Sequence, residues 1–281
     1  MRYIVSDEHR VYEMSPSNPP ALEVPTGTEL TFITRDCFDG QVDWSRFPES
    51  LDEIDRSRTN PATGPVAIEG ARPGDTLCVE ILDVKVDERG FANGVAFQIS
   101  HGEAILPGGL RMPIKPVIGV IGVSPAEGSI RNSTPGDHGG NLDTKEVTTG
   151  SKVYLPVWVE GALLAMGDIH ALQGDGEVCG QGIEIGGRVT IRVNLVDLDL
   201  PRKPVVETSS HICIITAAET LDRAADDIVR LTRGWLARRL GISEREAFAL
   251  LSTLCDLEIS QIVNPLKAVK MCIPKDLLRF A

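Results

Sequence analysis

The first informative property of this 281-residue chain is what it has little of. Aromatic residues make up 5% of it, and its six cysteines stand apart without a Cys-x-x-Cys pair. Few aromatic residues beside 27 glycines and 18 prolines argue against a helical bundle and favour turns and β-hairpins. Scattered cysteines argue against a zinc ribbon and against a dense disulfide framework. We therefore expect a reduced, β-rich protein.

Positive charge and long apolar runs are scarce as well. The 40 acidic residues outnumber the 28 basic ones and give a formal net charge of −12. Nucleic acids and anionic membranes bind basic surfaces, so neither is an expected partner. No apolar run approaches the ~18 residues that span a bilayer, and the acidic N-terminus lacks the apolar core of a signal peptide. We expect a cytoplasmic location and a small neutral or cationic ligand.

Short β-branched stretches separated by turn residues fill the chain from Leu30 to about Val196. The turn-rich run from Pro107 to Pro113 reads as an ordered loop. This spacing predicts a sandwich- or barrel-like β body over residues 1–204. Strands are expected at residues 30–34, 76–86, 117–123, 152–159, 163–170 and 188–195.

The pattern changes to helical beyond Pro204. Residues 219–240 place an apolar face at helical spacing, with Gly241 as a stop. Ser243 and Glu246 form a capping box that opens a second helix. We expect a helical C-terminal portion, residues 205–281, that packs on the sheet and does not fold independently. The predicted fold class is therefore β-rich α+β. The apolar face of the first helix is expected to consist of Leu221, Ala225, Ile228, Leu231, Trp235 and Leu236.

Between Lys152 and Arg188 the chain carries no lysine or arginine, although acidic groups gather there. Such carboxylates repel one another unless a cation or a proton holds them together. A divalent metal ion or a substrate-linked proton is therefore the first expectation for this segment. The groups concerned are Glu160, Asp168, His170, Asp175, Glu177 and Glu184.

Two of these residues stand in strand-like sequence. Asp168 and His170 are two positions apart, so their side chains leave the same face of a strand and can address one metal ion. A lone Asp-x-His pair is more often a satisfied polar strand edge. The Asp175-Gly turn shifts the balance, because it predicts a return strand that brings Glu177 beside Asp168 and ends near Glu184. On that return strand Cys179 is expected to be buried and inert.

Further polar residues flank glycine and proline turns. His138, Asn141 and Asp143 surround a glycine pair, so this segment is either a substrate loop that also ligates metal or a surface turn. Asp36 ends a strand and is either an oxygen ligand or a turn former. Asn60 lies in a structural loop, where its side chain can hold an amide. The signature loops of serine hydrolases and nucleotide-binding folds are absent from the sequence.

The segment from residue 157 to 180 strongly resembles the acetamidase/formamidase family. Residues 60–65, 117–123 and 138–143 carry the same resemblance, which covers roughly residues 36–184 and weakens beyond them. It implies hydrolysis of short aliphatic amides, such as formamide or acetamide, to the carboxylate and ammonia. It also implies a β-rich fold with α/β elements, a homodimer or larger homo-oligomer, and metal ions, often zinc or calcium, at the acidic site.

The resulting hypothesis assigns a role to each candidate residue. The metal ion is placed on Asp168 and His170, with Asp36 and His138 as the next ligands. Either Glu177 or Glu184 acts as general base and then general acid, and Asn60, Asn141 and Asp143 orient the amide. Two alternatives stay open: a hydrolase of the same fold acting on a cyclic amide or another C–N bond, and a non-catalytic, metal-stabilised binding protein.

Overall fold

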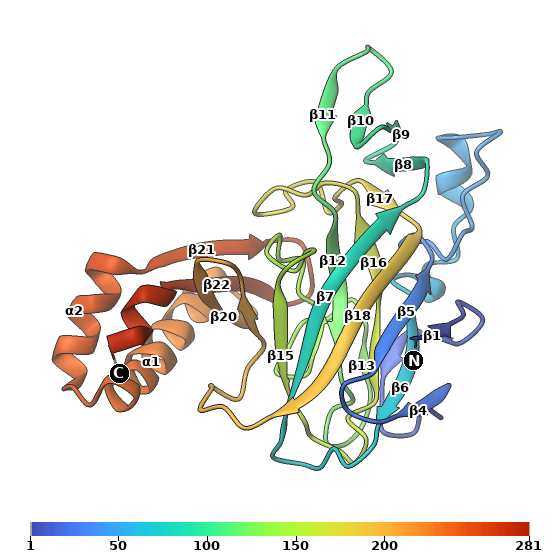
Figure 1. Ribbon diagram of the computed structural model, residues 1–281. Coiled ribbons are helices and arrows are strands. Elements are labelled where there is room, and N and C mark those ends of the chain that lie inside the picture. The colour runs from blue at the N-terminus through green and yellow to red at the C-terminus, as the bar shows by residue number, and fades with distance from the viewer. Residues whose placement is uncertain (1, 281) are drawn as a thin grey trace.

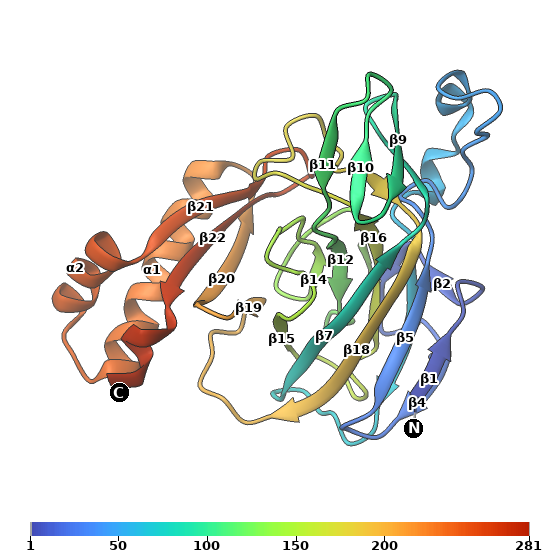
Figure 2. The ribbon, with the colours of Figure 1, turned by 45° about the horizontal axis from the view of Figure 1, so that its top comes forward.

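The computed structural model describes residues 2–280. It consists of two stacked β-sheets, one of which extends beyond the other and is covered there by two helices (Figure 1). The sheets are packed face to face and do not close on each other (Figure 2). The predicted β-rich α+β class is therefore confirmed, and the β body is a sandwich rather than a barrel.

The first sheet runs through the whole molecule. Its long central strands pair antiparallel, with Thr76 to Val86 aligned against Val196 to Gly187. Among residues 2–280 it contains, in spatial order, β1 (Arg2–Val5), β5 (Glu29–Thr34), β18 (Gly187–Val196), β7 (Thr76–Val86), β15 (Lys152–Pro156), β19 (Val205–Glu207), β20 (His211–Ala218), β22 (Lys267–Pro274) and β21 (Asp256–Gln261).

The second sheet carries the candidate site. Its central strand, β16 (Leu164–His170), lies between β17 (Glu184–Ile185) and β12 (Val117–Gly122), and all seven of its residues are buried. The order continues to β14 (Gly139–Asn141) on one side and to β8 (Arg89–Ala92), β9 (Val95–Ser100), β10 (Glu103–Ile105) and β11 (Arg111–Pro113) on the other. β6 (Ala62–Ile68) joins β16 to β2 (Arg10–Val11) and β4 (Leu22–Val24), while β3 (Glu13–Met14) pairs with β13 (Ile130–Arg131).

Most predicted strands lie within a residue or two of their observed bounds. The exceptions contain prolines. The strand predicted at 152–159 ends at Pro156, and the run 107–113, predicted as a loop, contributes Arg111–Pro113 to an edge strand. An edge strand tolerates proline because one side of it has no hydrogen-bonding partner.

Two apolar cores hold these layers together. The larger core fills the space between the two sheets, with Phe32 and Ile191 of the first sheet and Ile121 and Met166 of the second among its fully buried members. The smaller core lies between the helices and the β20–β22 end of the first sheet. The first sheet therefore buries apolar area on both faces and contributes to both cores.

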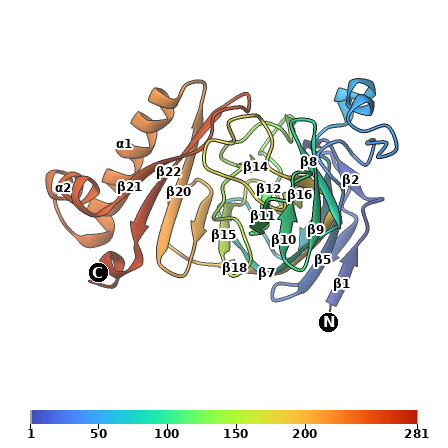
Figure 3. The same cartoon turned by 90° about the horizontal axis from the view of Figure 1, so that it is seen from above.

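Two helices cover the C-terminal end of the first sheet. α1 (Leu221–Leu240) and α2 (Glu244–Leu254) lie on the side away from the sandwich (Figure 3). Gly241 ends α1 with φ +65°, and the predicted capping box of Ser243 and Glu246 is present. The buried face of α1 differs from the predicted one at its start, since Ala224 rather than Ala225 is buried.

Short 3-10 helices occur at η1 (Glu49–Glu53), η2 (Arg56–Arg58) and η3 (Lys275–Phe280). None of the helices described between residues 2 and 280 is long and apolar enough to cross a membrane. β19 to β22 continue the first sheet without a break. That the C-terminal portion does not fold independently stays a prediction.

Replacement of Trp235 by alanine is expected to destabilise the protein by about 3–5 kcal/mol. The Trp235 ring is 2% exposed in the smaller core, and its Nε1–H donates to the carbonyl oxygen of Asp199 at 2.9 Å. Urea unfolding followed by far-ultraviolet circular dichroism measures the loss. Phe248→Ala is the matched control, because that ring is 48% exposed and its removal should cost less than 1 kcal/mol. Two separate transitions in the parent protein would contradict the predicted dependence of residues 205–281 on the β body.

Candidate active site

The site begins at a backbone irregularity in β16. Asp168 adopts φ +52° within the strand, an uncommon left-handed conformation for a residue other than glycine. Its neighbour on β12 is Gly119, where a Cβ atom would lie 2.6 Å from Oδ1 of Asp143 and 2.8 Å from the carbonyl oxygen of Asp168. Only glycine leaves room for these two acidic residues to approach the strand. The position of these buried carboxylates is therefore set by the packing of the strands themselves.

His170 lies at the centre of the acidic groups. Its Nε2 atom is 3.3 Å from Oε2 of Glu184, 3.8 Å from Oδ1 of Asp168 and 3.9 Å from Oε1 of Glu177. Glu184 stands opposite His170 in the β16–β17 pair. We call these residues, together with Cys37 and Asp143, the acidic cluster. The structure thus brings together four of the residues that the sequence predicted to meet, Asp168, His170, Glu177 and Glu184.

Glu177 reaches the acidic cluster from a loop, and the predicted return strand is wrong. Residues 171–183, called the site loop below, separate β16 from β17, and strand pairing resumes only at Glu184. Glu177 has φ +46°, and its Oε1 accepts a hydrogen bond from the N–H of Gly182 at 3.0 Å. Gly182 also lies against the imidazole, since a Cβ there would be 2.6 Å from Cγ of His170. The site loop is thus a long hairpin connection that folds onto the histidine, and Glu177 lies in it rather than on the return strand.

Amide side chains fix the orientation of the acidic cluster. Nε2–H of Gln173 donates to the carbonyl oxygen of Asp143 at 2.7 Å, so its Oε1 faces Nδ1 of His170 at 2.9 Å. Nδ1 must then carry the proton, and in a neutral ring Nε2 presents its lone pair to the carboxylates. Asn264 donates to Oδ2 of Asp143 at 2.6 Å, and Asn60 donates to Oδ2 of Asp168 at 2.7 Å. Each of these two carboxylates therefore has one oxygen bound and the other free.

Burial sets the electrostatics of the acidic cluster. It raises the pKa of Glu184 to about 8 and that of Glu177 to about 10, with neighbouring carboxylates adding to the shift. It also raises the pKa of Asp143 to about 6. The surrounding carboxylates raise the pKa of His170 despite its burial. Burial and neighbouring negative charge both raise the pKa values of the carboxyl groups, whereas only the negative charge raises that of His170.

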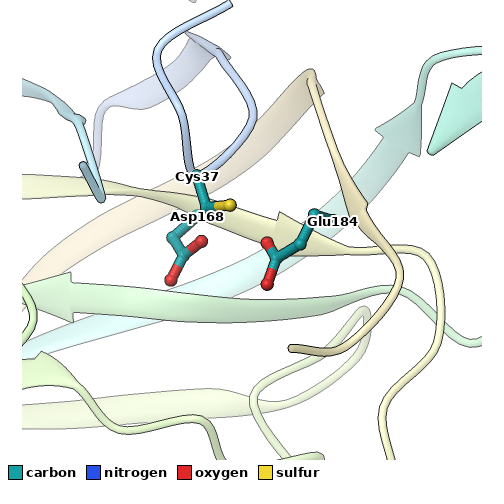
Figure 4. A group of neighbouring side chains, drawn as sticks. All are labelled: Cys37, Asp168 and Glu184. Carbon is teal, nitrogen blue, oxygen red and sulfur yellow. The ribbon is translucent and has the colours of Figure 1, made fainter. Parts of the chain in front are cut away.

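The free atoms of the acidic cluster identify it as a potential metal site. Oδ1 of Asp143, Oδ1 of Asp168, Nε2 of His170 and Oε2 of Glu184 are buried and have no hydrogen-bond partner. Ligand atoms of Cys37, Asp168 and Glu184 lie within 4.8 Å of one another, as do those of Asp143, His170 and Glu177. Figure 4 shows the first three side chains converging on one space. Buried polar atoms seldom lack partners, and each group combines carboxylates with a donor that zinc accepts, a thiol in the first and an imidazole in the second.

Two of the residues predicted as ligands stand apart from these groups. Asp36 uses Oδ1 to accept hydrogen bonds from the N–H groups of Phe38 and Gly40, so its oxygen serves as a turn former. His138 belongs to neither ligand group of the described chain and borders a separate cavity of about 230 Å³. Burial lowers the pKa of His138 to about 4, which keeps its ring neutral.

The predicted amide-orienting residues divide between the cavity and the acidic cluster. Asn60 and Asn141 both line a cavity of about 480 Å³ beside the cluster. Oδ1 of Asn141 is buried without a hydrogen-bond partner, so it can accept an N–H from a ligand. Asp143 instead groups with His170 and Glu177 among the potential metal ligands. The cavity is lined by Cys37, Phe38, Leu51, Arg56, Thr59, Asn60, Asn93, Gly94, Asn141, Asp168, Glu177, Cys179, Gly180, Gln181, Glu184 and Asn264.

Three residues of the site escape sequence reasoning. Cys37, Gln173 and Asn264 reach it from a turn, the site loop and the segment between β21 and β22. Their only sequence signal is proximity to predicted strand ends and turns. The expected burial of Cys179 is wrong, because this thiol is exposed while Cys37 is buried.

Comparisons with known proteins agree with this geometry. The model of the Acetamidase/Formamidase family matches residues 6–110 and 118–280 and confirms the resemblance. An acetamidase structure from Bacillus halodurans is 42% identical with a TM-score of 0.94, and each chain is 99% covered. A predicted acetamidase/formamidase from Thermoanaerobacter tengcongensis is 40% identical with a TM-score of 0.94, covering 99% of this chain and 97% of that one. An acetamidase from Mycolicibacterium smegmatis is 28% identical over 64% of this chain, which spans 64% of that relative's length.

In protein freed of metal by a chelator, the free energy of unfolding is expected to fall as pH rises from 6.5 to 8. The folded chain holds the Glu184 proton up to about pH 8, whereas an unperturbed glutamate releases it near 4.5. The folded state therefore binds more protons in this window, and stability that is complete below pH 4.5 is lost as pH passes 8. The lowered pKa of His138 has the opposite effect, a rise of stability with pH, which fades above the ordinary histidine pKa of 6.5.

Urea unfolding at pH 6.5, 7, 7.5 and 8 measures this slope, to which Glu184 contributes on the order of 2 kcal/mol across the window. Glu184→Gln should reduce the slope by that share, while the raised pKa values of Glu177 and His170 maintain the rest. Glu160→Gln, which removes an exposed carboxylate from the same lysine-poor segment, should leave the slope unchanged. Equal slopes in Glu184→Gln and the parent protein would contradict the assignment.

Proposed function

Because this chain belongs to the acetamidase/formamidase family, we propose that it hydrolyses short aliphatic amides to a carboxylate and ammonia. The observation that carries the proposal is the acidic cluster, which borders a cavity and presents unbonded carboxylate and imidazole atoms. An unactivated amide needs a stronger nucleophile than water, a polarised carbonyl group and a proton for the leaving nitrogen. A buried, acid-rich site beside a cavity is suited to all three.

The reaction is proposed to be assisted by a divalent metal ion. Asp168 and Glu184 with Cys37, and Asp143 with His170, are the residues that would hold it, replacing Asp36 and His138 of the sequence hypothesis. Of the two expected ions, a thiol and an imidazole favour zinc, because calcium prefers oxygen ligands alone. Such an ion, when bound, supplies a Lewis acid that polarises the carbonyl oxygen and lowers the pKa of water.

Glu177 is proposed as the general base and acid. It lines the cavity, and its Oε1 is held 3.9 Å from Nε2 of His170 by the N–H of Gly182. Burial raises the pKa of Glu177 to about 10, so its role as a base requires that a cation bound beside it lower this pKa. As a carboxylate, Glu177 then removes a proton from the attacking water as the oxygen bonds to the amide carbon. The same carboxyl then donates that proton to the nitrogen as the C–N bond breaks and ammonia leaves. One carboxyl group carries out both proton transfers, so the reaction needs no second acid.

Asn141 is proposed to orient the amide. Its Nδ2–H donates to Oδ1 of Asn264 at 3.3 Å, which leaves its own Oδ1 turned to the cavity without a partner. This oxygen accepts an N–H of the substrate and directs the nitrogen toward Glu177. Asn60 acts indirectly, because its side-chain N–H₂ is bound to Asp168.

A hydrolase of the same fold acting on a cyclic amide is the second candidate. The cavity of about 480 Å³ falls in the size range of sites for drug-sized ligands, so it has room for more than acetamide. A panel of formamide, acetamide, propionamide and a γ-lactam, assayed for ammonia release or ring opening, separates the two candidates. The cytoplasmic location and the homo-oligomeric state stay predictions.

Glu177→Gln is expected to lower kcat for the best amide by about 10²–10⁴-fold, because glutamine cannot transfer the proton. Ammonia release measures the loss, and an unchanged melting temperature and metal content show that the fold is kept. Glu160→Gln is the control and should retain full activity. A Glu177→Gln variant with parental kcat would remove the proposed base, and a parent protein that binds amides without turnover would favour the non-catalytic alternative.

Removal of metal by a chelator is expected to abolish amide hydrolysis, and zinc is expected to restore it better than calcium. Metal content by mass spectrometry gives a readout that does not depend on activity. Cys37→Ala should weaken zinc binding by about tenfold or more. Cys179→Ala, at the exposed thiol of the same cavity, should bind zinc like the parent. Full activity in rigorously metal-free protein would contradict metal assistance.

A further inference from the structure

The C-terminal hairpin formed by β21 and β22, residues 256–274, makes direct contact with the site loop. Figures 1 and 2 show these two strands extending from the helices toward the sandwich. The N–H of Gly176 donates to the carbonyl oxygen of Ser260 at 2.9 Å, and the N–H of Ile262 donates to the carbonyl oxygen of Gly176 at 3.1 Å. The site loop therefore pairs with the outer edge of β21 through one residue, Gly176, which directly precedes Glu177.

A buried lysine lies beneath this contact. Lys270, in the middle of β22, is 0% exposed, and its Nζ is 2.7 Å from Glu146, 2.8 Å from Asp175 and 3.3 Å from Glu258. Burial alone would lower the pKa of Lys270, but Glu146 and Asp175 raise it, so the ammonium stays charged. A buried ammonium is retained only where carboxylates surround it. Asp175, also paired with Lys145, is the one of these carboxylates that belongs to the site loop.

These contacts fix consecutive residues of the chain. The side chain of Asp175 is held by Lys270, the main chain of Gly176 is held by β21, and Glu177 follows with φ +46°. Two anchors immediately before a residue leave its backbone little freedom, so they determine where its carboxyl group points. Without them Glu177 would be held only by hydrogen bonds within the site loop itself, to Gly174, Gly180 and Gly182.

We propose that Lys270 is a positioning residue for Glu177, acting through Asp175 and Gly176, so that the C-terminal hairpin completes the site. The inference rests on the proposed role of Glu177 in amide hydrolysis. It differs from a purely structural role of Lys270 in one measurable way. A structural lysine affects how much protein is folded, whereas a positioning lysine affects the turnover of protein that is fully folded.

Asp175→Ala is the first variant, because Lys270 keeps two carboxylate partners in it and the fold should survive. At a temperature well below its melting point, its kcat is expected to fall by about tenfold to hundredfold, with KM changed less than twofold. Lys270→Met should lower kcat by no more than Asp175→Ala does, because Lys145 still pairs with Asp175, and Lys270→Arg should recover part of the loss. The double variant Asp175→Ala with Lys270→Met should be no worse than the poorer single variant, since both changes cut the same link.

Lys275→Met is the matched control. Lys275 lies in the same C-terminal portion and pairs with Glu207 at 2.5 Å, without a contact to the site loop. Its replacement should lower the melting temperature and leave kcat unchanged. Parental kcat in folded Asp175→Ala, or an equal loss of kcat in Lys275→Met, would overturn the proposal.

Amide hydrogen exchange separates this inference from the proposed function. In Asp175→Ala, peptides covering residues 171–183 should exchange at least about tenfold faster than in the parent, while peptides from β7 and β18 should not change. This result supports the anchoring even if the parent protein hydrolyses no amide, in which case the proposed function alone fails. Unchanged exchange in the site loop would overturn the anchoring, whatever the activity of Glu177→Gln.

Discussion

The repulsion between buried carboxylates is the constraint on which the rest of this structure depends. Asp143, Asp168, Glu177 and Glu184 surround one imidazole, and among the described residues none of the four forms an ion pair with a lysine or arginine. In a low-dielectric interior such charges are stable only with bound protons or a cation. The raised pKa values of Glu177 and Glu184 mean that these groups keep bound protons, and the unbonded ligand atoms are available to a cation.

Neutral amides around the acidic cluster determine how this repulsion is arranged. Asn60, Gln173 and Asn264 each bind an atom of the cluster or its backbone and add no charge. They hold one oxygen each of Asp143 and Asp168 in place and fix the proton on Nδ1 of His170, so the other oxygen of each carboxylate is left without a partner. Orientation by surrounding hydrogen bonds is what gives a ligand atom a single direction.

The sequence predicted the parts of the site that depend on local pattern. Alternation in residues 163–170 was sufficient to place Asp168 and His170 on one strand, and Glu184 followed from the expectation of a neighbouring strand. The pattern failed where distant segments meet. Cys37 and Asn264 enter through tertiary packing, which period-two alternation does not record. The turn signal at Asp175 was real, but its aspartate binds Lys270 of a distant strand, so the chain continued as a loop. His138 lies outside both ligand groups of the described chain and borders a separate cavity, because a glycine-flanked position does not tell which cavity a turn will face.

The cavity wall is built from two kinds of segment. Asp168 and Glu184 stand on paired strands, whereas Phe38, Leu51, Arg56 and Thr59 belong to the excursion between residues 38 and 59, which contains only short 3-10 helices. Changes in that excursion alter the shape of the cavity without disturbing strand pairing or the acidic cluster. Reactivity and ligand preference are thereby encoded in separable stretches of the gene. Such a layout lets natural variation, or directed evolution confined to about twenty codons, explore new ligands while the chemical machinery is inherited intact.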